Sequence, residues 1–164
     1  MQNFIIREVE ESELENCAEI IRKSFATVAA EFNLTQENCP TNGAFLTFDR
    51  LLSERQSGKL QYGLLINDNL AGFVCLNKTK ENHIYSLEKL AVLPEFRHNG
   101  GGLALLNFAE EKVKSFGGEK ITIGIIEENI ILKEWYLRNG FIHTGATVIP
   151  SLPFTVGFME VIIL

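Results

Sequence analysis

The stretch Leu90-Ala91-Val92-Leu93-Pro94, followed shortly by Arg97-His98-Asn99-Gly100-Gly101-Gly102, decides how the rest of this sequence folds. An apolar run that ends at a proline predicts the end of a strand, and three successive glycines predict a turn. Residues 103–116 then carry apolar side chains at helical spacing and stop at Gly117-Gly118. The turn is therefore expected to lead directly into a helix.

A strand, a glycine turn and a helix start, in that order, direct several backbone N–H groups toward one point. The helix N-terminus adds about half a positive charge there, and glycine lets the backbone approach a ligand closely. This arrangement suits a phosphate or pyrophosphate. The turn lacks the Lys-Ser/Thr of a P-loop and does not match the G-x-G-x-x-G of dinucleotide folds. The alternative is a turn that only connects a strand to a helix.

The first half of the chain predicts strands and helices in an α/β order. Residues 4–9 form a strand candidate, and Ser12-Glu13-Leu14-Glu15 has the form of a capping box that starts a helix reaching Phe25. A second helix is expected from about Thr41 to Gln56. Two strands, residues 60–66 and 70–76, flank Asn67-Asp68-Asn69, which is good hairpin chemistry. A third strand is expected from His83 to Leu93.

The second half adds a parallel crossover. Residues 120–126 alternate and are rich in Ile and Thr, so strand, helix and strand follow one another in a right-handed connection. Asn129 can cap a helix that ends near Asn139, and residues 141–149 and 155–164 form the last strands. The fold class is α/β (α+β in some schemes): one domain over residues 1–164, with a mixed, mostly antiparallel sheet of about seven strands and about four helices.

Composition narrows the function. The 164 residues are 46% hydrophobic and 22% charged, which is typical of one globular domain. The net charge of −6 argues against a nucleic-acid partner, whose phosphates need clustered Lys and Arg, and it is compatible with a cationic substrate. Three unpaired cysteines without a metal-ligand spacing predict no metal and a cytoplasmic protein. No signal peptide and no stretch of about 20 apolar residues is found, so no membrane partner is expected.

Residues 88–141 resemble the GNAT superfamily of acetyl-CoA-dependent N-acetyltransferases. Arg97, Gly100 and Gly102 meet its signature R/Q-x-x-G-x-G/A, and Asn129 and Trp135-Tyr136-Leu137-Arg138-Asn139-Gly140-Phe141 follow in the family's order. The resemblance implies direct transfer of the acetyl group from acetyl-CoA, in a ternary complex, to a primary amine of a small molecule or peptide.

The resemblance also assigns residues to the acetyl-CoA site. The turn beginning at Arg97 would hold the pyrophosphate through the amides of His98, Asn99, Gly100, Gly101, Gly102 and Leu103. The main chain of Leu90, Ala91 and Val92 would pair with the pantetheine arm along a bulged strand that splays from its parallel neighbour. The Leu90 amide would polarise the thioester carbonyl. Asn129 would touch the pantetheine or adenosine side.

Two residues are implied as catalysts. Tyr136 would protonate the departing thiolate; its alternative role is that of a helix residue packed on the core. Glu88, expected on the same strand face as Leu90, would accept the amine proton; the alternatives are a solvated residue, a partner of Lys89, or a water chain that replaces any single base. Histone-type members place a glutamate two positions earlier, where this chain has Ser86.

The acceptor and the assembly stay open. In the family, residues corresponding to 24–60 set acceptor specificity; here Phe25, Phe32, Phe45 and Phe48 belong either to the core or to an acceptor pocket. Rival functions are a non-catalytic acyl-CoA-binding sensor on the same fold and a plain nucleotide-binding or structural α/β domain. Residues 161–164 read as an inner strand, but at a sheet edge they would pair with a second copy, so the protein is a monomer or a homodimer.

Overall fold

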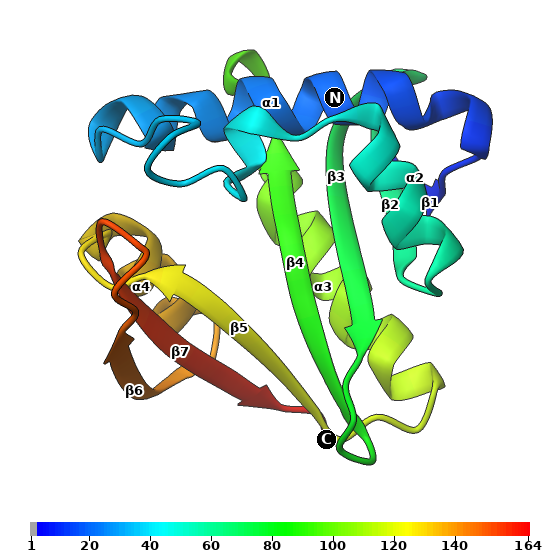
Figure 1. The fold of residues 1–164 in the computed structure, drawn as a ribbon. Helices are drawn as coiled ribbons and strands as arrows, with labels where there is room; N and C mark the ends of the chain where they lie inside the picture. The colour runs from blue at the N-terminus through cyan, green and yellow to red at the C-terminus, as the bar shows by residue number, and fades with distance from the viewer. Residues whose placement is uncertain (1–2) are drawn as a thin grey trace.

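The computed structural model describes residues 3–164, which form one sheet with helices on both faces (Figure 1). The strands are β1 (Phe4–Glu8), β2 (Leu60–Ile66), β3 (Asn69–Lys78), β4 (Ile84–Val92), β5 (Lys120–Ile126), β6 (Ile142–Val148) and β7 (Thr155–Ile162). The helices are α1 (Leu14–Glu31), α2 (Phe48–Gln56), α3 (Gly101–Ser115) and α4 (Ile130–Arg138).

The seven strands follow the order β1-β2-β3-β4-β5-β7-β6. Only β4 and β5 run parallel, and every other neighbouring pair is antiparallel. The sequence predicts this mixed, mostly antiparallel sheet with four helices, and the structure confirms it. The single parallel pair is joined through α3, which is how a crossover connects parallel strands.

The side chains sort into two layers. Under α1 and α2 lies a cluster that includes Leu14, Ile21, Leu51, Phe73 and Ala91. On the other face, α3 and α4 pack on a larger cluster drawn from most of the strands, with α3 contributing Leu105, Leu106, Ala109 and Val113. Alternation along each strand directs side chains to one layer or the other.

Local sequence explains the element ends, with two corrections. Asn67 and Asp68 adopt positive φ values of 50° and 70°, as the predicted β2–β3 hairpin requires. The helix expected from about Thr41 begins instead at Phe48, because the Thr47 side chain accepts from the Arg50 N–H and caps it there. Ser12 caps no helix.

In place of that capping box, a short 3-10 turn, Glu11–Glu13, precedes α1. The Glu13 carboxylate accepts a hydrogen bond of 2.9 Å from the Glu10 N–H, so the capping residue is Glu10, two positions before the predicted Ser12.

The C-terminal strand β7 is an inner strand, between β5 and β6. Its last residues, Val161 and Ile162, pair with β5 but lie beyond the final β6 pair, Ile142 with Glu160. The edge strands are β1 and β6, and pairing with a second copy stays a prediction. Within residues 3–164, every helix falls short of the length and apolar character needed to cross a membrane.

Candidate active site

The two parallel strands separate after a short contact. Residues 84–86 of β4 pair with residues 120–122 of β5, and beyond Ser86 the two strands have no paired residues. Figure 1 shows them diverging toward α1, so that the second half of β4 has a sheet partner on one side only. This opening exposes main-chain groups on β4 that a ligand could use in place of a strand.

A β-bulge interrupts β4 within this opening. Glu88 lies opposite Cys75, whereas Ala91 lies opposite Phe73, so the register shifts by one residue between them. Lys89 takes a φ of 53° at this point. One extra residue reverses the alternation of side chains along a strand.

The bulge overturns one expectation about Glu88. Its side chain shares the α1 and α2 face with Cys75 and Ala91, while Leu90 packs on the cluster under α3 and α4. The prediction that Glu88 and Leu90 occupy one face is therefore wrong, because regular alternation does not hold across the inserted residue.

The register also settles which amides face the opening. The Leu93 N–H donates to the Ala71 carbonyl at 2.8 Å. Since successive residues of a strand alternate, Ala91 directs its N–H and C=O toward β3, and Leu90 and Val92 direct theirs away from it. Of the three residues expected to pair with a pantetheine arm, only Leu90 and Val92 are placed to do so.

The glycine turn lies at the end of this strand. Gly100, with a φ of 88°, immediately precedes α3, and His98 has a φ of 65°. His98, Asn99, Gly100 and Leu103 are exposed, so a ligand can approach the start of α3, whose first N–H groups have no partner within the helix. A Cβ on Gly101 would lie 3.0 Å from Leu64 Cδ2, so this glycine is also needed for packing.

Arg97 turns its side chain away from the turn. Its guanidinium donates to the Ser24 carbonyl at 2.7 Å, to Ser24 Oγ at 3.2 Å and to Thr27 Oγ1 at 3.1 Å, and Nε donates to the Val92 carbonyl at 3.3 Å. Burial lowers the pKa of Arg97. The arginine of the signature thus ties the turn and the end of β4 to α1.

Helix α4 brings Tyr136 to the same region. The Cβ position of Gly102 lies 3.7 Å from Trp135 Cζ2, so α4 reaches the start of α3. Tyr136 is 5% exposed and packs edge to face on Phe141, and no residue between 3 and 164 hydrogen-bonds to its hydroxyl. Burial raises the pKa of Tyr136, so the phenol keeps its proton at neutral pH.

Asn129 acts at the start of α4. Its side chain accepts a hydrogen bond of 3.2 Å from the Leu132 N–H, as predicted for a helix cap. The preceding carboxylates are also engaged: Glu127 pairs with Lys133 and with His143, and Glu128 accepts from the Thr155 N–H at 3.0 Å. These acids therefore organise the end of β5.

Glu88 belongs to a group of four charges. Its Oε2 lies 2.8 Å from Lys59 Nζ, and Lys59 lies 3.2 Å from Glu54 Oε1, which in turn lies 2.5 Å from Lys89 Nζ. Lys89 and Glu88 are 3.8 Å apart. The expected Lys89 partner of Glu88 is thus the more distant of its two lysines.

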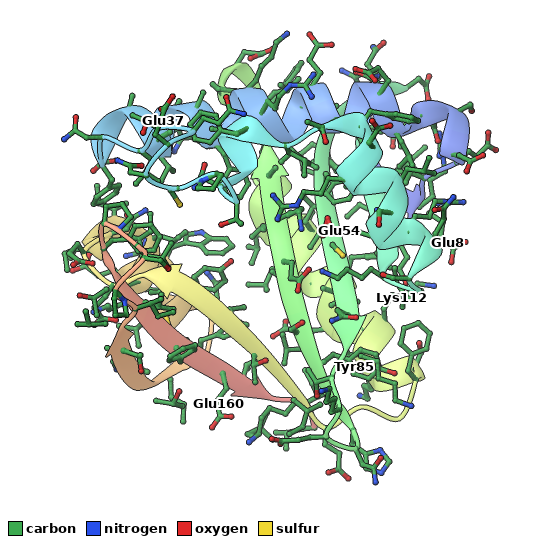
Figure 2. The ribbon with its side chains drawn as sticks, viewed as in Figure 1. Glu8, Glu37, Glu54, Tyr85, Lys112 and Glu160 are labelled. Atoms are coloured by element: carbon green, nitrogen blue, oxygen red, sulfur yellow. The ribbon has the colours of Figure 1, made fainter. Side chains whose placement is uncertain are left out.

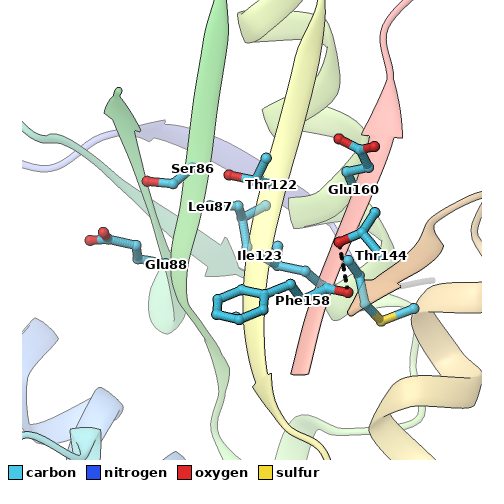
Figure 3. A pocket seen from close by; sticks show the side chains of 10 residues that line it. Ser86, Leu87, Glu88, Thr122, Ile123, Thr144, Phe158 and Glu160 are labelled. Carbon is cyan, nitrogen blue, oxygen red and sulfur yellow. Dashed lines mark hydrogen bonds between the residues drawn. The ribbon is translucent and has the colours of Figure 1, made fainter. Parts of the chain in front are cut away.

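A pocket of about 390 Å³ lies beside Glu88 where β4, β5 and β7 meet. Ser86 and Glu88 line it from β4, and Phe158 and Glu160 from β7 (Figure 3). Its lining contains two carboxylates and no basic residue. Glu160 also pairs with Lys120 at 2.8 Å, outside the lining.

The aromatic residues expected near the acceptor are mostly core. Phe25 and Phe48 pack on the cluster under α1 and α2, and Phe32 packs on a third cluster that contains Leu34 and Ile126. This third cluster joins the end of α1 to the end of β5 across the open side of the sheet.

The sequence of residues 21–141 matches the profile of the acetyltransferase (GNAT) family. The chain belongs to the GNAT family. A curated relative, an uncharacterized N-acetyltransferase in the pepI 3′ region of Lactobacillus delbrueckii subsp. lactis, is 25% identical over 147 residues, which cover 85% of each chain. As a GNAT member the protein is an acyl-CoA N-acetyltransferase that uses acetyl-CoA.

Solved GNAT structures share the fold. The PaiA N-acetyltransferase of Thermoplasma acidophilum, solved with coenzyme A, superposes with a TM-score of 0.75 at 22% identity, over 98% of this chain and 99% of that one. The ribosomal-protein-S18-alanine N-acetyltransferase of Escherichia coli gives 0.77 at 16% identity, over 98% and 94%.

The local structure of the glycine turn and of β4 fits an acetyl-CoA molecule. A left-handed glycine precedes a helix with free N–H groups, and the adjacent strand has no strand partner for the main chain of Leu90 or for the Val92 N–H. Among residues 3–164, no group of three His, Cys, Asp or Glu is arranged to hold a metal ion.

Three residues that contact the site could not be predicted from the sequence. Glu54, Lys59 and Ser24 meet β4 and Arg97 only through the packing of α1 and α2 on the sheet. No residue spacing in the sequence predicts these contacts.

Proposed function

We propose that this GNAT enzyme transfers the acetyl group of acetyl-CoA directly to a primary amine of a small molecule or peptide, with both substrates bound together. One observation carries the proposal: the main chain of β4 at Leu90 and the Val92 N–H have no strand partner in the opening, and this strand leads straight into the glycine turn at the start of α3. A strand-like slot joined to an anion cradle matches the two ends of a phosphopantetheine ligand.

Different main-chain groups bind different parts of acetyl-CoA. Amides from His98 to Leu103 hold the pyrophosphate, and the outward N–H and C=O groups of Leu90 and the N–H of Val92 align the pantetheine arm. The Leu90 N–H faces the acyl oxygen and stabilises the charge that grows there. Acetyl-CoA, when bound, supplies an acyl carbon activated by a thiolate leaving group.

Tyr136 supplies the proton for the leaving group. The amine nitrogen bonds to the acyl carbon as the carbon–sulfur bond breaks, the sulfur takes up a proton, and the nitrogen gives one up. Burial raises the pKa of the Tyr136 phenol, and the same apolar surroundings raise the pKa of a thiol, so transfer between them remains feasible.

Glu88, or water beside it, receives the proton that the amine loses. An alkylamine has a pKa of about 10.4 and must be deprotonated before it attacks. Glu88 lines the pocket, which favours it as the acceptor of this proton, but its carboxylate also holds Lys59 at 2.8 Å. The proposal therefore includes both proton acceptors, Glu88 and a water molecule beside it.

The pocket beside Glu88 receives the acceptor amine. Two carboxylates, Glu88 and Glu160, line it; each also holds a lysine that lies outside the lining. A cationic amine fits because it can share these carboxylates while its carbon chain lies on the Phe158 ring. The alternative function, an acyl-CoA sensor without turnover, predicts the same donor site.

The test measures release of free coenzyme A thiol from acetyl-CoA against a panel of amines. Tyr136→Phe is expected to lower kcat by about 100-fold or more, the range for a lost general acid. Tyr85→Phe is the matched control, since Tyr85 stacks on Phe116 at the far end of β4. Equal activity of the Tyr136 and Tyr85 variants would remove Tyr136 as the acid.

The donor site is tested separately by calorimetric titration with acetyl-CoA. Gly102→Glu places a carboxylate at the start of α3, where a Cβ meets only ordinary contacts, and is expected to weaken binding at least about tenfold. Gly145→Glu adds the same charge to β6 in open space and should leave binding unchanged. Binding that ignores Gly102→Glu would reject the assignment; binding without turnover for any amine would support the sensor.

A further inference from the structure

A side chain from α2 reaches the bulge in β4. The Glu54 carboxylate lies in front of the middle strands of the sheet (Figure 2), and its Oε1 is 2.5 Å from Lys89 Nζ. Lys89 is the residue of the bulge itself and has a φ of 53°. An ion pair thus joins a helix on one face of the sheet to the one irregular residue of the strand that borders the opening.

The backbone at Lys89 needs such support. Residues with a side chain rarely adopt left-handed angles, and a lysine has no local hydrogen bond to favour them as Asn or Asp does. A strand with one unpaired side can relax such a residue to ordinary extended angles. A partner that fixes the Lys89 side chain holds the backbone in the bulged form.

The ion pair is buried more deeply than a surface pair. The side chains of Glu54 and Lys89 are 13% and 12% exposed, and Glu54 Oε2 is buried without a hydrogen-bond partner among residues 3–164. Burial raises the pKa of Glu54, but hydrogen bonds and charges from Lys89 and Lys59 outweigh it and lower the pKa below its ordinary value. The carboxylate is therefore charged at neutral pH.

Stability alone is a poor explanation for this pair. Removing two charges from water offsets most of their attraction, so a buried pair is better explained by what it positions. The residue that follows Lys89 is Leu90, whose N–H faces the opening between β4 and β5. The bulge sets the direction of that N–H, because one inserted residue reverses the alternation of the strand.

We propose that Glu54 is a positioning residue for acetyl transfer: through Lys89 it holds the β4 bulge that aims the Leu90 N–H into the opening. The inference rests on the proposed function, in which this N–H stabilises charge on the acyl oxygen. Glu54 touches no reacting atom, and its carboxylate is committed to Lys89 and Lys59.

The first test is Glu54→Gln, which keeps the shape of the side chain and removes its charge. We expect kcat to fall on the order of tenfold or more, because small misplacements of a catalytic group are costly. The KM for acetyl-CoA should stay within about twofold, since most of the donor's affinity comes from the glycine turn. Glu13→Gln makes the same change in a more exposed pair, with Arg7 of β1 on the side of the sheet away from the opening; it is the control and should leave kcat unchanged.

The second test uses Lys89→Gly, because glycine adopts a positive φ without support. In this background Glu54→Gln should cause no further loss of kcat, so the two changes must be non-additive. A Glu54→Gln effect of equal size in both backgrounds would overturn the inference, as would an unchanged kcat in the single variant.

A readout without turnover completes the experiment. In the ligand-free protein, the amide NMR signals of Lys89 and Leu90 should shift or broaden in Glu54→Gln and stay in place in Glu13→Gln. Unmoved signals would overturn the inference. A wild-type protein that turns over no amine would overturn the proposed function along with it, whereas wild-type turnover with an unaffected Glu54→Gln variant would overturn the inference alone.

Discussion

At the scale of single residues, Arg97 of the GNAT signature joins the glycine turn to α1. Its guanidinium donates hydrogen bonds to oxygens of Ser24, Thr27 and Val92. Arg97→Met should lower the free energy of unfolding by about 2–3 kcal/mol, because it removes hydrogen bonds from a charged donor to Ser24 and to the Val92 carbonyl, both part-buried. Denaturant titration measures the loss. Arg50→Met, which removes one exposed hydrogen bond to the Thr41 carbonyl, should cost less than about 1 kcal/mol.

Arg97→Lys sharpens this prediction. A lysine lacks the planar fork that reaches several oxygens at once, so it should restore only part of the lost stability. Full recovery by lysine, or equal losses for the methionine variants of Arg97 and Arg50, would contradict the role given to this side chain.

At the scale of elements, the cap of α4 can be separated from ligand binding. Asn129→Ala should lower the free energy of unfolding by about 1 kcal/mol, because the Leu132 N–H loses its acceptor. Asn129→Asp keeps an acceptor and adds a charge that favours the helix N-terminus, so it should retain the stability. Urea unfolding of the ligand-free variants measures both. Similar losses in the two variants would show that capping is not what Asn129 contributes.

At the scale of the whole molecule, acid should weaken the attachment of the first strand. The Arg7 hydrogen bonds, at 2.9 and 3.0 Å, lower the pKa of Glu13 from 4.5 to about 2 and so tie β1 to the start of α1. A lowered pKa in the folded state stabilises it fully above about pH 4.5. This contribution is lost as the pH falls toward 2, since the unfolded state binds the proton first.

Glu13→Gln should therefore lose less stability than the wild type between pH 4.5 and pH 2, where the group titrates. Urea unfolding at a series of pH values measures the slope. Glu11→Gln, a change at an exposed neighbouring position, should keep the wild-type slope. Parallel slopes for the wild type and the Glu13 variant would rule out this contribution.

Much of the fold was open to prediction because its signals are local. Alternation predicted β5 with its observed limits. The Asn67-Asp68 turn and the strand-like run before it predicted β2, with its observed limits, and the hairpin between β2 and β3. The predicted start of α2, at about Thr41, was too early. Apolar side chains also precede Thr47, so the apolar pattern did not show that Thr47 caps the helix. The glycine turn, Asn129 and Tyr136 were recognisable because their spacing lies within one segment of about fifty residues.

The sequence by itself determined the donor end of this protein: the strand ending at Leu93, the glycine turn and the helix that follows, whose chemistry depends on consecutive residues. Only the tertiary structure decided which amides of β4 face the opening, where the Arg97 side chain goes and what holds Glu88. The bulge at Lys89 reversed the expected faces of the strand. Glu54 meets Lys89 from α2, and Ser24 meets Arg97 from α1. Contacts between segments far apart in the chain are set by the packing of layers, and no local spacing encodes them.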